Sequence, residues 1–239
     1  MRVVQELTVH QITFFPRVFP VNCYFVEEEN SLTLIDAALP FSAPGIIAAA
    51  DRIGKPITRI VLTHAHDDHV GALDALKQAL PDAAVYISKR DARLLAGDRG
   101  LMPSEPQMPI RGGVPKHVKT RPDVLLHDGE QLGSLQAIAA PGHTPGSMAF
   151  LDTRNGALIA GDAFQTRGGI AVSGQLRPWF PFPAWATWNK ALALDSARKL
   201  LALAPSLLAI GHGRLLASPA PWMIQAIAAA EQRLALQPR

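Results

Sequence analysis

The sequence predicts an α/β protein in which helices cover β-sheets. The main observation is that strand-like and helix-like segments alternate along the first third of the chain, a pattern that builds helices onto sheets. Hydrophobic residues make up 48% of the 239 residues and charged residues 18%, which is ordinary for a globular protein and excludes a disordered chain. The eighteen glycines and twenty prolines follow no repeat period, which excludes collagen and solenoid architectures.

The elements of the first third follow from hydrophobic patterns and helix-start signals. A helix is predicted over residues 46–53, with Ser42 as its N-cap. The apolar spacing predicts a second helix over 70–80, and Ser88 with Asp91 has the spacing of a third helix start. Runs rich in branched and aromatic residues, bounded by turn residues, predict strands at 22–26, 32–35, 57–62 and 84–87.

The rest of the chain contains two irregular stretches between regular elements. Residues 97–122 are rich in proline and glycine, and loops of that length are usually functional or mobile. A second irregular stretch, 163–186, precedes a helix predicted over 187–203, and a final helix is predicted over about 218–237. Strand-like runs lie at 124–126, 135–139, 148–151, 157–159 and 207–210. Because no low-complexity linker interrupts the chain, we expect one domain over 1–239.

Charge, cysteine content and the distribution of apolar residues limit which partners, disulfides and cellular locations are expected. The formal charge of +3 is too weak to indicate a nucleic-acid partner. The single cysteine, Cys23, cannot form an internal disulfide. No signal peptide is recognised at the N-terminus, and the most apolar stretch, 200–210, is interrupted by Pro205 and too short to cross a bilayer. We therefore expect a soluble cytoplasmic protein without a membrane partner.

A cluster of histidines follows the predicted strand 57–62. The segment 64–69 reads H-A-H-D-D-H, with three histidines and two aspartates in six residues. A tight loop at the end of a strand can direct several imidazoles at one point, and imidazole and carboxylate are ligands for Zn²⁺ and Fe²⁺. An accidental histidine-rich surface loop is the alternative, which the spacing directly after a buried strand disfavours.

Three later motifs have related features. They are P-G-H-T-P-G-S at 141–147, A-G-D-A at 160–163 and G-H-G at 211–213, and each follows an apolar, strand-like run. Each places one histidine or aspartate beside small residues, so that a metal can approach closely. One such motif is weak evidence because a lone histidine beside glycine is more often a turn residue. Together with the first motif, and in this order, they form a strong pattern.

The chain resembles the metallo-β-lactamase superfamily, whose signature is an early Asp, then H-x-H-x-D-H, then His, Asp and His. The matches extend from about residue 22 to 213, and the early Asp is Asp36. The resemblance implies an αββα sandwich: two packed mixed sheets, helices on the outer faces, and metals at one edge. It also implies seven metal ligands, namely His64, His66, Asp68, His69, His143, Asp162 and His212.

The resemblance further assigns a role to each of these positions. One metal is expected on His64, His66 and His143, and the other on Asp68, His69 and His212. Asp162 is expected to bridge the two, while Asp36 orients one of the ligands. The cofactors expected are two divalent ions per chain, zinc first, with iron and manganese as alternatives. Asp67 occupies the variable position and is left out.

A dinuclear hydrolase is the function that this site implies. A hydroxide bridging the two metals would attack an ester, thioester or lactone, and Asp68 is the candidate to carry the proton to the leaving group. Two alternatives stay open. One is an oxidoreductase like the persulfide dioxygenases, with a single iron on His64, His143 and Asp162. The other is a phosphodiesterase or nuclease of the same superfamily.

Comparison with particular enzyme classes of the superfamily bears on which hydrolase activity is expected. Lactonases that cleave acyl-homoserine lactones often have a Tyr three residues after the bridging Asp, where this chain has Gln165. From the short stretch after Gly213 we expect one helix, and we do not expect the C-terminal glutathione-binding domain of glyoxalase II enzymes. A metal-binding module without turnover is a third class, which metal content and an ester assay would distinguish.

The two irregular stretches are the candidate walls of the substrate site. Residues 88–122 contain eight basic against three acidic residues, and 163–190 contain three basic residues and no acid, which suggests a small-molecule substrate with a negative charge. The second stretch also holds a run of aromatic residues that can form an apolar wall, or alternatively a homodimer interface. The candidate substrate-binding residues are Arg177, Trp179, Phe180, Phe182 and Trp185.

Overall fold

The computed structural model describes residues 1–236, and its first half forms a seven-stranded mixed sheet. The first four strands pair antiparallel in chain order, and the last four run parallel to one another, so that β4 belongs to both parts. The strands in spatial order are β1 (Arg2–Glu6), β2 (Val9–Phe14), β3 (Val21–Glu27), β4 (Leu32–Ile35), β5 (Ile57–Val61), β6 (Ala84–Ser88) and β7 (Val124–Leu126).

The second half forms a six-stranded mixed sheet and a short two-stranded one. In the larger sheet only β11 and β14 are parallel neighbours. Its strands in spatial order are β15 (Leu216–Ala217), β14 (Leu207–Ala209), β11 (Ala157–Ile159), β10 (Met148–Asp152), β9 (Leu135–Ala139) and β8 (Gln131–Leu132). The small sheet pairs β12 (Phe164–Gln165) with β13 (Ala171–Val172).

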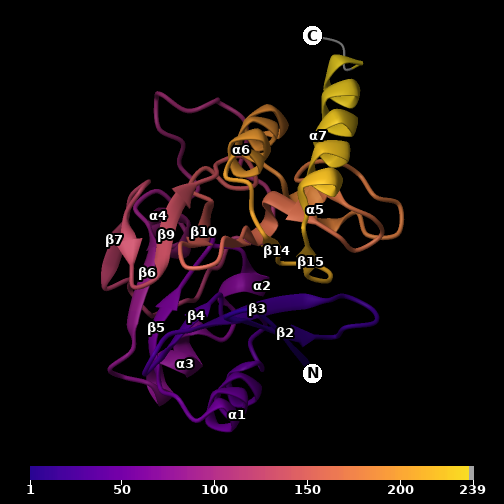
Figure 1. The fold of residues 1–239 in the computed structure, drawn as a ribbon. Helices are drawn as coiled ribbons and strands as arrows, with labels where there is room; N and C mark the ends of the chain where they lie inside the picture. The colour runs from indigo at the N-terminus through magenta and orange to yellow at the C-terminus, as the bar shows by residue number, and fades with distance from the viewer. Residues whose placement is uncertain (237–239) are drawn as a thin grey trace.

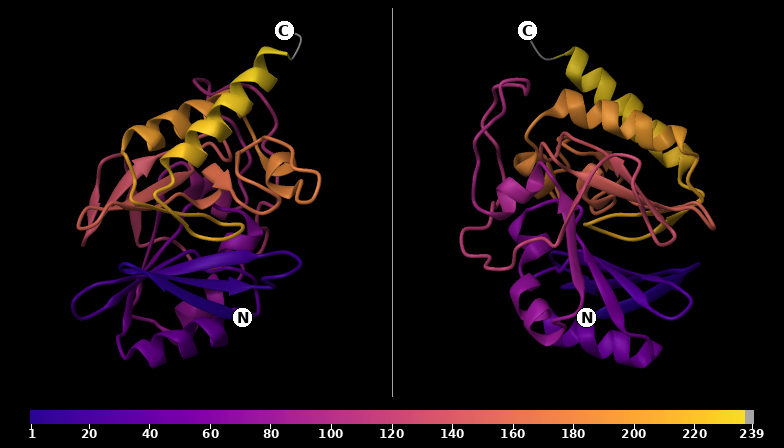
Figure 2. Two further views of the ribbon diagram at one scale, coloured as in Figure 1. Left: turned by 45° about the vertical axis from the view of Figure 1, so that its right-hand side comes forward. Right: turned by 90° about the vertical axis from the view of Figure 1, so that its left-hand side faces the viewer.

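The helices cover the outer faces of the two large sheets, as Figures 1 and 2 show. Below the first sheet lie α1 and α3, and above the second lie α6 and α7. The layers are therefore helix, sheet, sheet and helix, which confirms the expected αββα fold. The helices are α1 (Ala43–Ile53), α2 (Asp67–Val70), α3 (Leu73–Ala79), α4 (Asp91–Leu95), the 3₁₀ turn η1 (Gly161–Ala163), α5 (Phe182–Ala186), α6 (Lys190–Ala202) and α7 (Ala220–Ala235).

Three hydrophobic clusters hold these layers together. One lies between α1, α3 and the first sheet, and a second lies between α6, α7 and the second sheet. The third lies between the two sheets, where Tyr24 and Val61 of the first sheet meet Phe150 and Ile159 of the second. Because side chains alternate between the faces of a strand, each sheet can supply apolar residues to both of its neighbours. The clusters thereby fix how the loops at the sheet edges meet.

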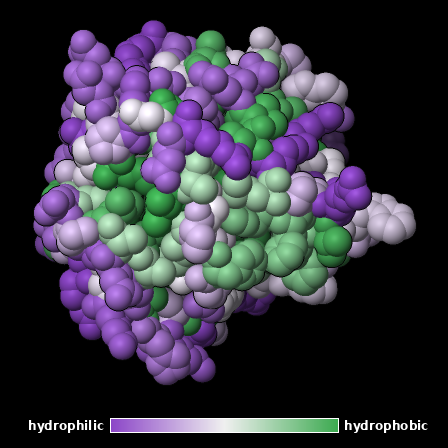
Figure 3. Space-filling model, turned by 90° about the horizontal axis from the view of Figure 1, so that it is seen from below, coloured by the Kyte–Doolittle hydropathy of each residue, from purple (hydrophilic) through white to green (hydrophobic). Residues whose placement is uncertain are grey.

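The surface seen from below carries a band of hydrophobic residues (Figure 3). Near the start of α1, the ring of Phe41 packs edge-on against Phe14 and Phe15, at centroid distances of 6.1 and 5.4 Å. Phe15 and Phe41 are both more than half exposed, and so is Met1. This aromatic cluster ties the β2–β3 hairpin to the beginning of α1.

The predicted elements correspond to observed ones, with different boundaries. The helix expected over 187–203 is α6, which begins only at Lys190 because Asn189 caps it by accepting a hydrogen bond from the backbone N–H of Leu192. The short helix α5 lies in the stretch 163–186 expected to be irregular. The final helix begins at Ala220, two residues later than expected, and position 237 of its expected range lies outside the described residues. No helix of the described chain is long and apolar enough to cross a membrane.

Candidate metal centre

The H-A-H-D-D-H segment forms a compact loop directly after β5. His66 has an extended backbone at the start of α2, and its carbonyl accepts the N–H of His69 at 2.9 Å. Two further backbone bonds anchor the loop: Asp67 N–H donates to Gly113 O at 2.7 Å, and Ala37 N–H donates to His69 O at 2.7 Å. The short helix points Asp68 and His69 toward the same side as the two earlier histidines.

The second sheet presents one polar side chain from each of three loops at the same edge. His143 lies between β9 and β10, Asp162 lies in η1 after β11, and His212 follows β14. Gly211, beside His212, has no space for a side chain, because a Cβ there would lie 2.7 Å from His69 Cε1 and would collide with the Asp162 carboxylate. Glycine at this position therefore lets the loop approach the cluster closely.

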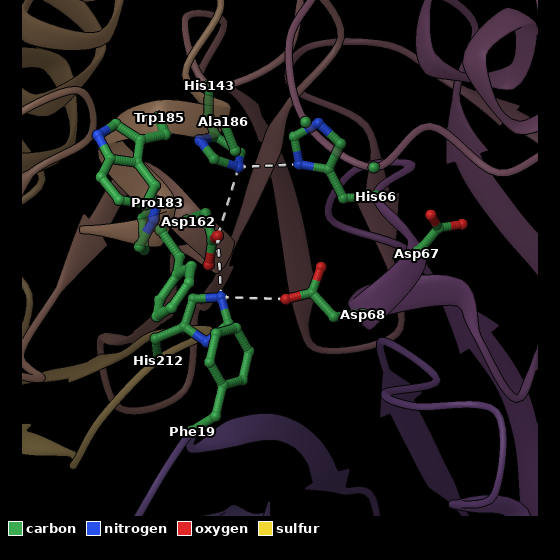
Figure 4. Close-up of a pocket in the computed structure, with 13 residues that line it drawn as sticks. Phe19, His66, Asp67, Asp68, His143, Asp162, Pro183, Trp185, Ala186 and His212 are labelled. Carbon is green, nitrogen blue, oxygen red and sulfur yellow. Dashed lines mark hydrogen bonds and ion pairs between the residues drawn. The ribbon is translucent and has the colours of Figure 1, made fainter. Parts of the chain in front are cut away.

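Asp162 lies between two groups of histidines, as Figure 4 shows. Its Oδ2 is 3.3 Å from His143 Nε2 and 3.3 Å from His212 Nε2, and its Oδ1 is 3.5 Å from His69 Nε2. The same His212 Nε2 is also 3.3 Å from Asp68 Oδ2. One carboxylate thus faces histidines of both expected metal sites.

The side chains group into three sets that could each hold a metal ion. In each set the potential ligand atoms lie within 4.8 Å of one another. The sets are His64, His66 and His143; Asp68, His69 and His212; and His64, His69 and Asp162. The structure therefore brings together all seven residues that the resemblance marks as metal ligands.

The buried polar atoms of this cluster fit a bound cation. His64 Nε2, His69 Nε2 and Asp162 Oδ1 are buried without a hydrogen-bond partner among the described residues. Leaving a buried polar atom unpaired costs about 1–3 kcal/mol, so three such atoms facing one another need a common partner. A set of imidazole and carboxylate groups without thiolate suits zinc, iron or manganese.

The outer nitrogens of the histidines have separate partners. His69 Nδ1 lies 2.7 Å from Asp36 Oδ2, and His143 Nδ1 lies 2.9 Å from Ser173 Oγ. His212 Nδ1 donates to Pro20 O at 2.8 Å. Such contacts hold an imidazole ring so that its other nitrogen faces the metal. Asp36 therefore lies where the resemblance expects an orienting residue.

Three histidines of the cluster are held neutral by their burial. Burial lowers the pKa of His64 and of His66, and it lowers the pKa of His143 to about 3. Burial disfavours the charged imidazolium, and the neighbouring histidines add repulsion at His64. A neutral imidazole has a free lone pair, so these three rings are ready to bind a cation.

The other two histidines are paired with carboxylates. Burial disfavours protonation of His69 and His212 too, but nearby carboxylates outweigh it. Asp36 and Asp162 raise the pKa of His69, and Asp162 and Asp68 raise the pKa of His212 to about 10. A metal bound here would have to displace these protons, which couples metal binding to proton release.

A cavity of about 390 Å³ opens over this cluster. Its apolar wall consists of Phe19, Phe182, Pro183, Trp185 and Ala186, and its polar side includes His66, Asp68, His143, Asp162 and His212. The carboxylate of Asp67 points away from the group of His143, Asp162 and His212 (Figure 4). The cavity has the size of a small ligand site and joins an apolar wall to convergent polar groups.

The structure separates the residues expected to bind substrate. Phe182 and Trp185 line the cavity, whereas Phe180 is buried beneath it, with its ring centroid 5.3 Å from that of His212. Trp179 is 88% exposed, and Arg177 lines a different cavity. The path of this loop has no periodic pattern, so the sequence does not show which of its residues face the metals.

The expected basic rim is absent from the cavity wall. No lysine or arginine belongs to the described lining of the metal-site cavity. Two of the loop arginines pair with carboxylates of the same stretch, Arg90 with Glu105 and Arg93 with Asp98. The basic charge of residues 88–122 is therefore partly neutralised within that stretch.

Asp91 is a residue of the site that the sequence pattern did not indicate. It is fully buried and joins two metal-site loops: Oδ2 accepts hydrogen bonds from Ala65 N–H at 3.0 Å and Thr144 Oγ1 at 2.7 Å, and Oδ1 accepts from Gly146 N–H at 2.8 Å. Its only sequence signal was the spacing from Ser88, whose Oγ does accept the Asp91 N–H at 3.0 Å.

Asn22 and Tyr24 of β3 hold the loop that carries His212. Asn22 Nδ2 donates to Ile210 O at 2.8 Å and to Gly213 O at 2.9 Å. Tyr24 OH donates to Ile210 O at 2.5 Å and accepts from Ile210 N–H at 2.9 Å. Through these contacts, a strand of the first sheet holds a loop of the second sheet in place. Sequence spacing alone could not reveal them.

The family assignment is decided by a match along most of the chain. A sequence model described as the metallo-beta-lactamase superfamily matches residues 16–212. The chain belongs to this superfamily. It is 63% identical over 232 residues to the uncharacterized protein YobT of Bacillus subtilis, a match that covers 97% of this chain and all of YobT.

Other relatives of this superfamily member are named as hydrolases. The probable metallo-hydrolase YflN of Bacillus subtilis is 32% identical over 214 residues, which is 80% of each chain. A hydroxyacylglutathione hydrolase of Gloeobacter violaceus is 30% identical over 62% of this chain, and that match covers half of the hydrolase.

Among solved structures, the crystal structure of TTHA1623 in a di-iron-bound form is similar to this chain. It is 29% identical, has a TM-score of 0.64, and the match covers 88% of this chain and 95% of the TTHA1623 chain.

Proposed function

We propose that this chain is a hydrolase of small esters, thioesters or lactones that works with two divalent metal ions. The observation that carries the proposal is the position of Asp162, whose two oxygens face histidines of both metal sets. A carboxylate between two such sets is what a pair of ions sharing one ligand requires. The names of two relatives, a probable metallo-hydrolase and a hydroxyacylglutathione hydrolase, support the reaction class.

The proposal assigns each side chain to a metal. One ion would be held by His64, His66 and His143, the other by Asp68, His69 and His212, and Asp162 would contact both. When bound, a pair of divalent ions supplies Lewis acidity that polarises a carbonyl group and lowers the pKa of water toward about 7. Zinc is the first candidate because the donors are imidazole and carboxylate, and iron is supported by the di-iron form of TTHA1623.

The chain's own residues would bind the substrate and move the proton. The rings of Phe182 and Trp185 form the exposed apolar wall, so an acyl or aryl group would pack there. Asp68 lies on the polar side of the same cavity and is our candidate to carry a proton to the leaving group. The cavity of about 390 Å³ limits the substrate to a small one or to one end of a larger molecule.

Metal analysis of freshly purified protein, combined with a substrate panel, tests this proposal. We expect two metal ions per chain, together with hydrolysis of at least one of a lactone, a thioester and an acetyl ester. His69→Ala should lose metal and hydrolysis together. His127→Ala is the matched control, since His127 is exposed and belongs to none of the metal sets.

Other outcomes would replace the proposal. A single iron per chain with consumption of O₂ on addition of a thiol persulfide would indicate the oxidoreductase. Cleavage of a phosphodiester without ester hydrolysis would indicate the phosphodiesterase. Two metals without turnover of any of these substrates would indicate a binding module.

A further inference from the structure

A second cavity, of about 380 Å³, is lined in part by Arg214, two residues after His212 in the same loop. It is formed by the turn between β12 and β13, the segment around Arg177, the loop before β15, and α7. It shares no lining residue with the metal-site cavity. The lining residues used below are Thr166, Ile170, Arg177, Arg214, Trp222 and Gln225.

This second cavity contains positive charge without a counter-charge. Arg177 and Arg214 both line it, no acidic residue belongs to its lining, and neither arginine forms an ion pair within residues 1–236. Arg177 is half-buried and donates through Nη2 to Ile170 O, but its Nε is buried without a partner in the described part of the chain. Burial and the nearby charge of Arg233 lower the pKa of Arg177. An unpaired, partly desolvated guanidinium is costly, and a bound anion would remove that cost.

The remaining walls of the cavity suit the rest of an organic ligand. Trp222, in the first turn of α7, is 53% exposed, and Ile170 adds aliphatic surface. An exposed indole offers a flat apolar surface for stacking at small entropic cost. Gln225 adds a neutral side-chain amide that can orient a ligand.

We propose that this second cavity is a binding site for a small organic anion, a carboxylate or phosphate carried on an apolar body. The guanidinium groups of Arg177 and Arg214 bind the anionic group, and Trp222 stacks against the apolar part. Arginine suits this role because its planar donors match the paired oxygens of carboxylate and phosphate. The proposal does not depend on the hydrolase reaction, because it concerns a separate cavity.

The cavity is connected to the metal centre through Thr166. The backbone N–H of Thr166 donates to His212 O at 3.1 Å, and its Oγ1 accepts the N–H of Arg214 at 2.8 Å and donates to Arg214 O at 3.1 Å. Gly213 has a φ of 123°, and a Cβ there would collide with Thr166 Oγ1. An anion on Arg214 therefore contacts the same short loop that positions His212.

Calorimetric titration of the purified, metal-loaded protein tests the site directly. The probes are phenyl phosphate and benzoate, which distinguish a phosphate from a carboxylate ligand, and benzyl alcohol as the neutral analogue. We expect saturable binding of at least one anion, none of benzyl alcohol, and weaker binding as salt is added. Arg214→Met should weaken the anion at least tenfold, and because Arg214 is exposed this variant should fold normally.

Two comparisons keep the result decisive. Trp222→Ala should weaken phenyl phosphate more than inorganic phosphate, because only the former has a ring to stack. Arg198→Met is the matched control, since Arg198 is an exposed arginine that pairs with Glu231 and lies outside the lining. Unchanged binding in both Arg214→Met and Arg177→Met would mean that the anion binds outside this cavity and would overturn the proposal. Absence of saturable binding by either anion would overturn it as well.

Discussion

The two sheets supply the metal cluster in different ways. The first sheet contributes four side chains from one loop of six residues: His64, His66, Asp68 and His69. The second contributes one side chain from each of three loops that are far apart in sequence. The first group is arranged by local backbone geometry, including the bond from His69 N–H to His66 O. The second group depends on how the two sheets pack.

Contacts from the first half of the chain hold the loops of the second. Asp91 binds the loop of His143 through Thr144 and Gly146, while Asn22 and Tyr24 bind the loop of His212. The lesson is that the second half of the site is more sensitive to substitutions away from the metals. Because these hydrogen bonds position the loops of His143 and His212, the loss of a single one of them should also weaken metal binding.

The largest expected effect is a loss of metal and activity, and its extent distinguishes a ligand shared by both metals from a ligand of only one. Asp162→Ala should lose both metals, because its oxygens face both sets, whereas His66→Ala should lose only one. Both variants should lower kcat/KM by more than the roughly 10–100-fold typical of residues that only orient a ligand. Metal content by elemental analysis and initial rates would be measured on the same samples. Two metals retained per chain in Asp162→Ala would contradict its bridging role.

The next effect in size concerns the buried carboxylate between the two loops. Asp91→Asn keeps the shape of the side chain but directs an amide N–H₂ at one or two of the three donors that Asp91 now satisfies. We expect metal affinity to fall about 10–100-fold and the free energy of unfolding to fall by about 1–3 kcal/mol. Chelator competition and denaturant unfolding measure the two quantities. Asp82→Asn, an exposed aspartate without a side-chain hydrogen bond in the described chain, is the control.

The same measurements distinguish a purely structural role of Asp91 from a role in positioning the metal ligands. If Asp91→Asn unfolds more easily but binds metal as tightly as the parent protein, the residue supports the fold and does not position the ligands. Restored affinity in Asp91→Glu with shifted unfolding would indicate that the carboxylate itself is needed.

The same contrast between the sheets explains what the sequence could predict. The H-A-H-D-D-H segment, His143, Asp162 and His212 could be predicted because each lies in a short motif after a strand and the set, in this order, matches the superfamily signature. The roles of Asp91 and Tyr24 were not, because their partners lie 26 to 186 residues away and are neighbours only through sheet packing. The course of 163–186 was unpredictable for a related reason. The burial of Phe180 sets the path of this segment, and no periodic pattern in the sequence announces it. Arg177 lies outside the metal-site cavity as a result.

A smaller effect is expected at the contact between β3 and the loop of His212. Tyr24→Phe removes the hydroxyl that pairs with Ile210 N–H and O, and it leaves that N–H without a partner. The carbonyl keeps its bond from Asn22. We expect a loss of about 1 kcal/mol in unfolding free energy and less than a tenfold loss in metal affinity. Tyr86→Phe, whose hydroxyl has no hydrogen bond in the described structure, should change neither.

The smallest effect should come from within the first loop, at the neighbour of a ligand. Asp67 is exposed and points away from the cluster, and only its backbone N–H, which an asparagine would keep, is bonded to Gly113 O. Asp67→Asn should therefore change stability by less than about 0.5 kcal/mol and kcat/KM by less than about twofold. Asp68→Asn is the paired variant and should lose metal from the set that includes His69 and His212. If Asp67→Asn lost metal instead and Asp68→Asn did not, the ligands of this loop would be shifted by one residue. In that case local backbone geometry would not arrange the first half of the site in the way inferred here.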